Sequence, residues 1–214
     1  MRALLFDVFG TCVDWRTSIM REAERFGLPP QLAQAWRDEY QPQLETVRSG
    51  QRPWVNLDVL HEIGLNRVLR AMDLTLTKPQ RAELVRGWHR LDPWPDVVAG
   101  LTRLKETYII APCSNGHIAQ SVNLAKFAKL PWDAILGAEI ARAYKPDPRV
   151  YRESVYALGL EVDEACMVAA HRQDLQAAAD VGLMTAFVER FGEDPGPPFE
   201  PDIVAYDFVE LASR

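Results

Sequence analysis

The sequence predicts an α/β fold, a doubly wound parallel sheet with an inserted helical lobe, on three observations. Short continuous apolar runs recur along the chain. Most of these runs alternate with helical patterns, which favours parallel strands joined by right-handed crossovers. One long stretch, from about residue 15 to residue 89, has only helical periodicity and no run typical of a buried strand.

The strand candidates are apolar at consecutive positions, as expected of strands buried on both faces. The first, Ala3–Phe6, ends directly before Asp7. The later ones are Tyr108–Cys113, a weaker run at Trp132–Leu136, Cys166–Ala170, Thr185–Val188 and a short strand near Ile203–Ala205. The Pro- and Gly-rich segment Gly192–Pro201 predicts a surface loop before the last strand.

Helical patterns occupy the spaces between the later strands, at Asp96–Glu106, Ile118–Phe127, Arg149–Leu158 and Gln173–Val181. The long stretch after the first strand predicts four helices, separated by Gly- and Pro-containing breaks at residues 27–30 and 50–53. We therefore expect a core of residues 1–14 and 91–214 and a helical cap of residues 15–90.

Composition narrows the function class. The 214 residues carry a net charge of -6, so no basic surface for nucleic acid or membrane is expected, and a small-molecule substrate is favoured. Cys12, Cys113 and Cys166 form no C-x-x-C pair, which suits a reducing compartment. No segment is long and apolar enough for a signal peptide or a membrane span, and a cytoplasmic location is expected.

Polar residues follow several predicted strands at the point where each strand ends. Ligands of open α/β sheets bind beyond the carboxyl ends of the strands. The segments concerned are Asp7–Thr11, Ser114–Gly116 and His171–Asp174, with Lys145 after the weaker run. A strand-tip carboxylate such as Asp7 can attack an electrophile and form an ester, or it can simply cap the following turn.

These segments together resemble the haloacid dehalogenase superfamily. The matching residues are Asp7-Val8-Phe9-Gly10-Thr11, Ser114-Asn115-Gly116, Lys145-Pro146-Asp147-Pro148 and Val168-Ala169-Ala170-His171 with Asp174. The resemblance covers essentially the whole chain, including the helical cap, and it implies a Rossmann-like core. All four motifs in this order and spacing are far more specific than any one of them.

Two residues decide the branch within the superfamily. Its phosphatases carry a second acid two residues after the nucleophile, and here that position is Phe9, which cannot donate a proton. They also carry an acid four residues before Asp174, and here that position is Ala170, which cannot bind a dication. We therefore expect a metal-independent hydrolase with no cofactor, acting on a substrate whose leaving group needs no proton.

The remaining pattern resembles the L-2-haloacid dehalogenase branch, which has an aromatic residue where Phe9 stands, at the substrate. The resemblance implies that Asp7 displaces halide from C2 of a short 2-haloalkanoate and that water then hydrolyses the ester to a 2-hydroxy acid. Ser114 would hold the substrate carboxylate, and Lys145 would offset the two negative charges. Well-known members have serine and asparagine where this chain has Ala169 and His171, so water activation is assigned to Asp174 and His171.

Further residues have a functional and a structural interpretation. The Trp36-Arg37 pair resembles a Trp-Arg pair of the family whose arginine receives the halide, so Arg37 would do this here, or it would be a solvated helix charge. Asn115 would share the halide site, or satisfy a turn. Trp54 would close the pocket or pack the cap, Tyr151 would support Lys145 or fill the core, and Thr11 would hydrogen-bond Asp7 or act as a cap.

Two other functions stay open at this point: a phosphatase or other small-molecule hydrolase on the same scaffold, and a catalytically silent carboxylate-binding protein. The substrate and water are the expected small-molecule partners, and the resemblance suggests a homodimer. His61, His89 and His117 have no metal-ligand spacing in the sequence, and we interpret them as structural or exposed.

Overall fold

The computed structural model describes residues 1–193 and 196–214. A six-stranded parallel sheet with the order β5-β4-β1-β6-β7-β8 forms its centre. The strands are β1 (Ala3–Phe6), β4 (Ile109–Ser114), β5 (Leu136–Gly137), β6 (Ala165–Ala169), β7 (Met184–Val188) and β8 (Ile203–Ala205). The predicted doubly wound α/β sheet is confirmed, although the weak run at Trp132–Leu136 contributes only a two-residue strand at its end.

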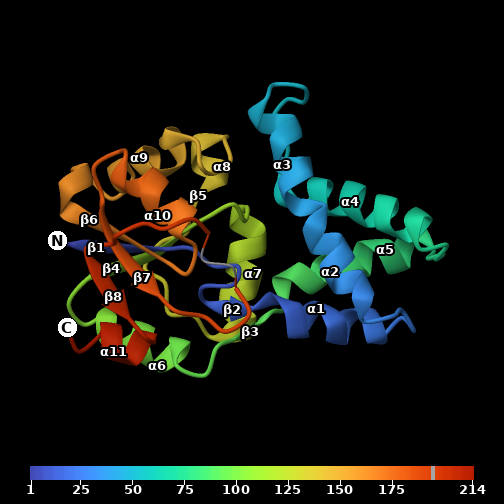
Figure 1. Ribbon diagram of the computed structural model, residues 1–214, viewed down its shortest axis with the longest axis horizontal. Coiled ribbons are helices and arrows are strands. Elements are labelled where there is room, and N and C mark those ends of the chain that lie inside the picture. The colour runs from blue at the N-terminus through green and yellow to red at the C-terminus, as the bar shows by residue number, and fades with distance from the viewer. Residues whose placement is uncertain (194–195) are drawn as a thin grey trace.

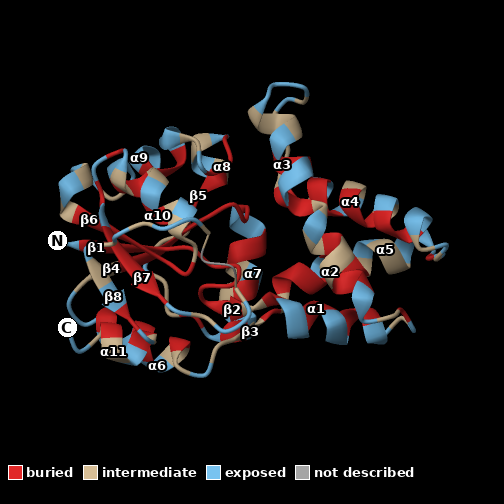
Figure 2. Cartoon of the chain, viewed as in Figure 1, coloured by how far each residue is buried: buried red, intermediate tan, exposed pale blue. Residues whose placement is uncertain are grey.

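Alternate residues of the first strand enter two separate apolar cores. Leu4 and Phe6 pack on the face covered by α6 (Val97–Leu104), α7 (Ile118–Ala128) and α11 (Phe208–Leu211). Ala3 and Leu5 pack on the opposite face, against α9 (Pro148–Tyr156) and α10 (Arg172–Ala179). The short helix α8 (Ala138–Ala141) follows β5, and the 3-10 turn η2 (Val162–Glu164) precedes β6. Figure 2 shows that the central strands, among them β1 and β6, are buried between these helices.

A helical lobe lies beside the sheet, next to α7 (Figure 1). Its helices are α1 (Trp15–Glu24), α2 (Gln31–Asp38), α3 (Tyr40–Arg48), α4 (Leu57–Ala71) and α5 (Lys78–Val85), followed by the 3-10 turn η1 (Arg86–His89). The prediction of four helices is wrong, because α2 was not expected. This helix has only eight residues and directly follows the Gly- and Pro-containing break at residues 27–30, and it buries Leu32, Ala33 and Trp36.

The chain enters and leaves this lobe through a two-stranded ribbon. Val13–Asp14 (β2) pairs antiparallel with Asp92–Pro93 (β3). The apolar core on the α7 face continues across this ribbon into the helical lobe without a break. The division into two domains at these positions stays a prediction. No helix in the described part of the chain is long and apolar enough to cross a membrane.

Candidate active site

Asp7 lies at the carboxyl end of β1, where its carboxylate is only 7% exposed. The backbone N–H of Asp7 donates to the carbonyl of Val168 on the neighbouring strand β6, at 2.9 Å. The hydroxyl of Thr11 donates to Asp7 Oδ2 at 2.8 Å, and its oxygen accepts the N–H of Ala170 at 2.9 Å. Thr11 therefore links the nucleophile candidate to the end of β6, as the first of its two sequence interpretations expected.

Lys145 brings two carboxylates together inside the protein. Its Nζ donates to Asp7 Oδ1 at 3.0 Å and to Asp174 Oδ2 at 2.5 Å, and all three side chains are at most 10% exposed. The hydroxyl of Tyr151 donates to the other oxygen of Asp174, at 2.5 Å. Tyr151 thus supports the lysine through Asp174 rather than by direct contact.

His171 stands on the other side of Asp7. Its Nδ1 lies 3.2 Å from Asp7 Oδ2, and its Nε2 lies 3.0 Å from Glu193 Oε2. The indole N–H of Trp15 donates to the second oxygen of Glu193 at 2.7 Å. An imidazole between two carboxylates is best satisfied when both ring nitrogens carry protons.

These contacts set the charges of the site. Burial opposes ionisation of Asp7, but Lys145 and His171 outweigh it and hold the pKa of that carboxyl well below its usual range. Burial likewise opposes protonation of His171, yet its hydrogen bonds to Asp7 and Glu193 raise its pKa to about 9. Burial opposes the charged form of Lys145, but Asp174 and Asp7 outweigh it and raise the pKa of the lysine. At neutral pH the site contains an ionised Asp7 flanked by two cations.

A cavity of about 350 Å³ opens in front of Asp7, between the sheet edge and the helical lobe. Arg37 lines it, and its Nη1 is buried with no hydrogen-bond partner among the described residues. The guanidinium lies over the ring of Tyr40, with Cζ 4.3 Å from the ring centre. The other lining residues are Phe9, Gln41, Arg48, Asn115, Lys145, Pro146, Tyr151, His171, Gln173, Asp174 and Gly196.

Asn115 uses both ends of its amide at the edge of this cavity. Its Oδ1 accepts the backbone N–H of Lys145 at 2.8 Å, and its Nδ2 donates to the hydroxyl of Tyr40 at 3.1 Å. The residue therefore connects β4, the lysine loop and the cap. Phe9 lies in edge contact with the ring of Trp88, 5.9 Å between centres, and places no proton donor beside Asp7.

Two predicted substrate-binding residues, Ser114 and Trp54, lie outside the lining of this cavity, as does Thr11. Ser114 is buried at the end of β4, and its hydroxyl accepts the N–H of Gly116 at 3.1 Å. It lines a different, very small pocket beneath Phe9. Trp54 is half-buried, packs against the main apolar core and has Arg142 over its ring at 4.9 Å. The structure thus supports the packing interpretation of Trp54, and Ser114 shapes the turn rather than the cavity wall.

Three further residues at the site were not expected from the sequence. Glu193 lies in the segment interpreted as a surface loop, yet it follows β7 at the same sheet edge as Asp7. The strand-end rule that selected Asp7 could have found it. Tyr40 and Arg48 lie on α3 of the cap, and Arg48 Nη1 donates to the carbonyl of Lys145 at 3.0 Å. No sequence signal identifies them, because only the packing of the cap places them over the sheet edge.

Comparison with known proteins agrees with this geometry. The profile of the haloacid dehalogenase-like hydrolase family matches residues 1–182. (S)-2-haloacid dehalogenase 4A of Burkholderia cepacia is 31% identical over 205 residues, which cover 94% of this chain and 88% of the relative. An (S)-2-haloacid dehalogenase of Pseudomonas sp. strain YL is 30% identical over 198 residues, covering 90% and 84% of the two chains.

Solved structures give the same picture. A defluorinating L-2-haloacid dehalogenase superposes with a TM-score of 0.94 at 42% identity, covering 100% of this chain and 94% of its own. A second L-2-haloacid dehalogenase superposes with a TM-score of 0.95 at 40% identity, covering 100% and 98%. The chain therefore belongs to the haloacid dehalogenase-like hydrolase family, on its L-2-haloacid dehalogenase branch.

Proposed function

We propose that this enzyme hydrolyses the carbon–halogen bond of short (S)-2-haloalkanoates and releases 2-hydroxy acids. The observation that carries the proposal is the state of Asp7: a buried carboxylate, kept ionised by Lys145 and His171, on the wall of a cavity that also contains Arg37. The relatives named (S)-2-haloacid dehalogenases support the substrate class and the enantiomer.

In the first step a carboxylate oxygen of Asp7 attacks C2 of the substrate, and the halide leaves with the electrons of the carbon–halogen bond. An ester forms, and no proton is transferred. Phe9 suits this step because a halide needs no general acid. Arg37 offers an unpaired buried N–H group to an anion in the cavity, either the leaving halide or the substrate carboxylate.

In the second step water attacks the ester carbonyl of Asp7, and the 2-hydroxy acid leaves with the oxygen that had belonged to Asp7. Formation of the ester removes the negative charge that His171 Nδ1 faces in the resting enzyme. The pKa of the imidazolium then falls, because one of its two anionic partners is gone. His171, still held by Glu193 and partly exposed, can release its proton to solvent and then take a proton from the attacking water, while the second water proton passes to the oxygen of the departing hydroxy acid.

Lys145 serves both steps. Substrate and Asp7 are both anions, and at about 4 Å two unit charges repel by about 4 kcal/mol at an effective dielectric constant of 20. Lys145 Nζ lies 3.0 Å from Asp7 and offsets this repulsion as a permanent positive charge that neither gains nor loses a proton. Asp174 and Tyr151 keep the ammonium in place.

A halide-release panel tests the proposal. Chloroacetate, bromoacetate, fluoroacetate and both enantiomers of 2-chloropropionate are incubated with the enzyme in excess EDTA, and halide and hydroxy acid are quantified. The expected result is release of chloride from chloroacetate and from the (S)-enantiomer, undiminished by the chelator. Fluoroacetate is included because one similar structure is described as defluorinating. Loss of all turnover in EDTA, or phosphate-ester hydrolysis in place of halide release, would overturn the proposal.

The ester intermediate has its own test. Enzyme in excess over substrate turns over once in ¹⁸O-labelled water, and the peptide containing Asp7 is analysed by mass spectrometry. Hydrolysis at the Asp7 carbonyl places the label in Asp7 and leaves the product oxygen unlabelled. Label in the product alone would indicate direct attack of water on C2, and no reaction at all would indicate a carboxylate-binding protein without catalysis.

We further propose that the enzyme is a cytoplasmic homodimer. Its three cysteines are buried free thiols, which suits a reducing compartment. Exposed apolar side chains at Val59 on α4 and at Ile118 and Phe127 on α7 are compatible with a subunit contact. Light scattering after size-exclusion chromatography measures the mass in solution, and a mass of one chain would contradict the dimer.

A further inference from the structure

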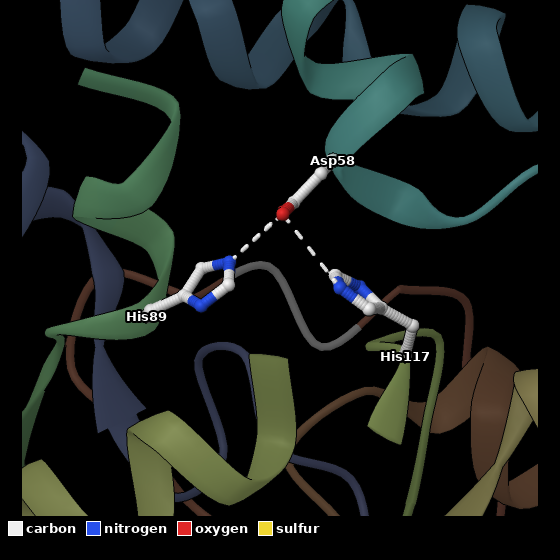
Figure 3. Close-up of side chains that lie close together, drawn as sticks. All are labelled: Asp58, His89 and His117. Atoms are coloured by element: carbon white, nitrogen blue, oxygen red, sulfur yellow. Dashed lines mark hydrogen bonds and ion pairs between the residues drawn. The ribbon is translucent and has the colours of Figure 1, made fainter. Parts of the chain in front are cut away.

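Three potential metal ligands meet at the junction of cap and core, away from the active-site cavity. Asp58 lies in the first turn of α4, His89 is the last residue of η1, and His117 precedes the first residue of α7. Figure 3 shows the two imidazole rings on either side of the Asp58 carboxylate. The three segments are distant in the sequence, and only the docking of the cap on the core brings these groups together.

The spacing of these groups fits a tetrahedral dication. Zinc binds imidazole nitrogen and carboxylate oxygen at about 2.0–2.2 Å, so two ligands at the tetrahedral angle lie about 3.3 Å apart. His89 Nε2 lies 3.0 Å from Asp58 Oδ1, and His117 Nε2 lies 3.6 Å from Asp58 Oδ2. One ligand atom of each residue lies within 4.8 Å of the other two. Small shifts of the rings would therefore place all three around one ion.

His117 has the unmet bonding capacity that points to a ligand. Its side chain is only 6% exposed, and its Nε2 is too far from Asp58 for a hydrogen bond. Its Nδ1 is buried without a partner among the described residues. A buried ring nitrogen with no partner among the described residues is unfavourable, and a ring whose other nitrogen faces a carboxylate at 3.6 Å has room for an ion between the two groups.

The surroundings suit a cation. His89 Nδ1 lies 3.0 Å from Nδ2 of Asn123. Rotation of this amide by a half-turn would bring its oxygen to the ring instead. The oxygen would then accept a proton from Nδ1 and leave Nε2 free to bind an ion. The charged groups nearest to the two imidazoles are acidic. They are Asp58 and Glu139, and the Glu139 carboxylate accepts the N–H of Ile118 and interacts electrostatically with His117. Asp58 is 30% exposed, which leaves a water-accessible side for a fourth ligand.

We propose that Asp58, His89 and His117 form a binding site for one transition-metal dication of the zinc type, which joins the cap to the core. Two imidazoles and a carboxylate favour Zn²⁺, Co²⁺, Ni²⁺ or Cu²⁺ over Mg²⁺ and Ca²⁺, which prefer sites made of oxygen ligands. The site is separate from the proposed reaction, which needs no metal. An ion bound there holds α4 against α7 and stabilises the closed arrangement of cap and core.

Calorimetric titration of the EDTA-treated enzyme with zinc chloride tests this proposal, with cobalt chloride as a spectroscopic probe of the ligands. The expected result is one ion per chain, with a visible Co²⁺ spectrum of a four-coordinate site. Asp58→Asn and His117→Gln should each weaken binding at least tenfold. Glu62→Gln, an exposed change on the same helix α4, is the matched control and should bind as the unaltered enzyme does.

The active site is also rich in carboxylates, so Asp7→Asn and Asp174→Asn are titrated in parallel. Binding that survives these two changes and is lost with Asp58→Asn supports the junction site, whatever the catalytic activity turns out to be. Binding lost with Asp174→Asn but kept with His117→Gln would place the ion in the active site and overturn the proposal. Absence of zinc binding by the unaltered enzyme at millimolar concentration would overturn it as well.

Circular dichroism of each variant tests whether it is folded. If His117→Gln unfolds, Asp58→Asn provides the decisive comparison, because asparagine has nearly the same shape as aspartate.

Discussion

Two clusters of histidine and carboxylate lie where cap and core meet, and only one of them contains a lysine. The active-site cluster contains Lys145, a fixed cation between Asp7 and Asp174. The junction cluster of Asp58, His89 and His117 has no lysine or arginine ion pair among the described residues. With its cation built in, the first cluster can receive an anionic substrate. The second has a carboxylate and two imidazoles, and it is suited to receive a cation.

Replacing the nucleophile should have the largest effect. Asp7→Asn removes the attacking carboxylate while keeping its size, and halide release should fall by roughly 10⁴-fold or more, as when other covalent nucleophiles are removed. Steady-state chloride release from (S)-2-chloropropionate measures it, with Asp38→Asn on the cap surface as the control. Residual activity within tenfold of the unaltered enzyme would refute the assignment of Asp7 as nucleophile.

Removing Lys145 should leave the active-site cluster, like the junction cluster, without a fixed positive charge. Lys145→Met leaves Asp7 and Asp174 buried without their common partner, which costs roughly 3–5 kcal/mol of unfolding free energy. Turnover should fall by roughly 10²–10³-fold, since the repulsion between substrate and nucleophile is no longer offset. Urea unfolding and halide release measure the two effects, and the exposed Lys126→Met is the control. Unchanged turnover would show that charge compensation by Lys145 is not needed.

The pH dependence of stability tests the charge of His171, the histidine of the active-site cluster. The pKa of His171 is about 9 in the folded protein against 6.5 for an ordinary histidine. Its extra stabilisation is therefore complete below pH 6.5 and is lost as the pH rises through 9. The difference corresponds to roughly 3 kcal/mol at most. Urea unfolding at pH 6 and pH 9.5 should show a stability advantage over His171→Gln that shrinks with pH. Parallel curves for the two proteins would contradict the doubly hydrogen-bonded imidazolium.

The smallest effect is expected at the junction cluster without metal. Asp58→Asn replaces a partly exposed carboxylate that lies 3.0 Å from His89 Nε2, a contact worth under about 1 kcal/mol. Burial alone would raise the pKa of Asp58, but His89 and His117 lower it. The contribution is therefore present at pH 7 and is lost on acidification through the folded-state pKa. In EDTA, the unfolding temperature at pH 7 should drop by roughly 2–4 °C and halide release should not change. A large loss of activity would mean that this pair positions the catalytic groups.

The core of the fold and the centre of the site could be predicted because both follow local rules. The first apolar run of the sequence predicted both ends of β1 correctly. The rule that ligands bind beyond the ends of strands selected the segments of Asp7, Asn115, Lys145 and His171, which the structure brings together. The cap was predicted less well. Its helix α2 has only eight residues and is separated from α3 by Glu39 alone, so it was not recognised as a separate element.

What could not be predicted depends on contacts between distant segments. Arg48 and Tyr40 reach the cavity only because α3 packs over the sheet edge. His89 and His117 have no informative spacing in the sequence and are buried in the structure, which excludes the exposed interpretation. Ser114 shows the converse limit: a residue at the right position of a motif can turn its hydroxyl to the local backbone instead of the cavity.

The β2–β3 ribbon, in which Val13–Asp14 and Asp92–Pro93 run side by side, has an evolutionary consequence. A segment whose two ends are adjacent can be exchanged as a cassette, because its replacement needs no rerouting of the host chain. Asp7, Lys145 and Asp174 all belong to the host, whereas Arg37, Tyr40 and Arg48 belong to the cassette. Selection can therefore alter which molecules the enzyme accepts by replacing the cassette, provided that the replacement matches the apolar surface around Phe9.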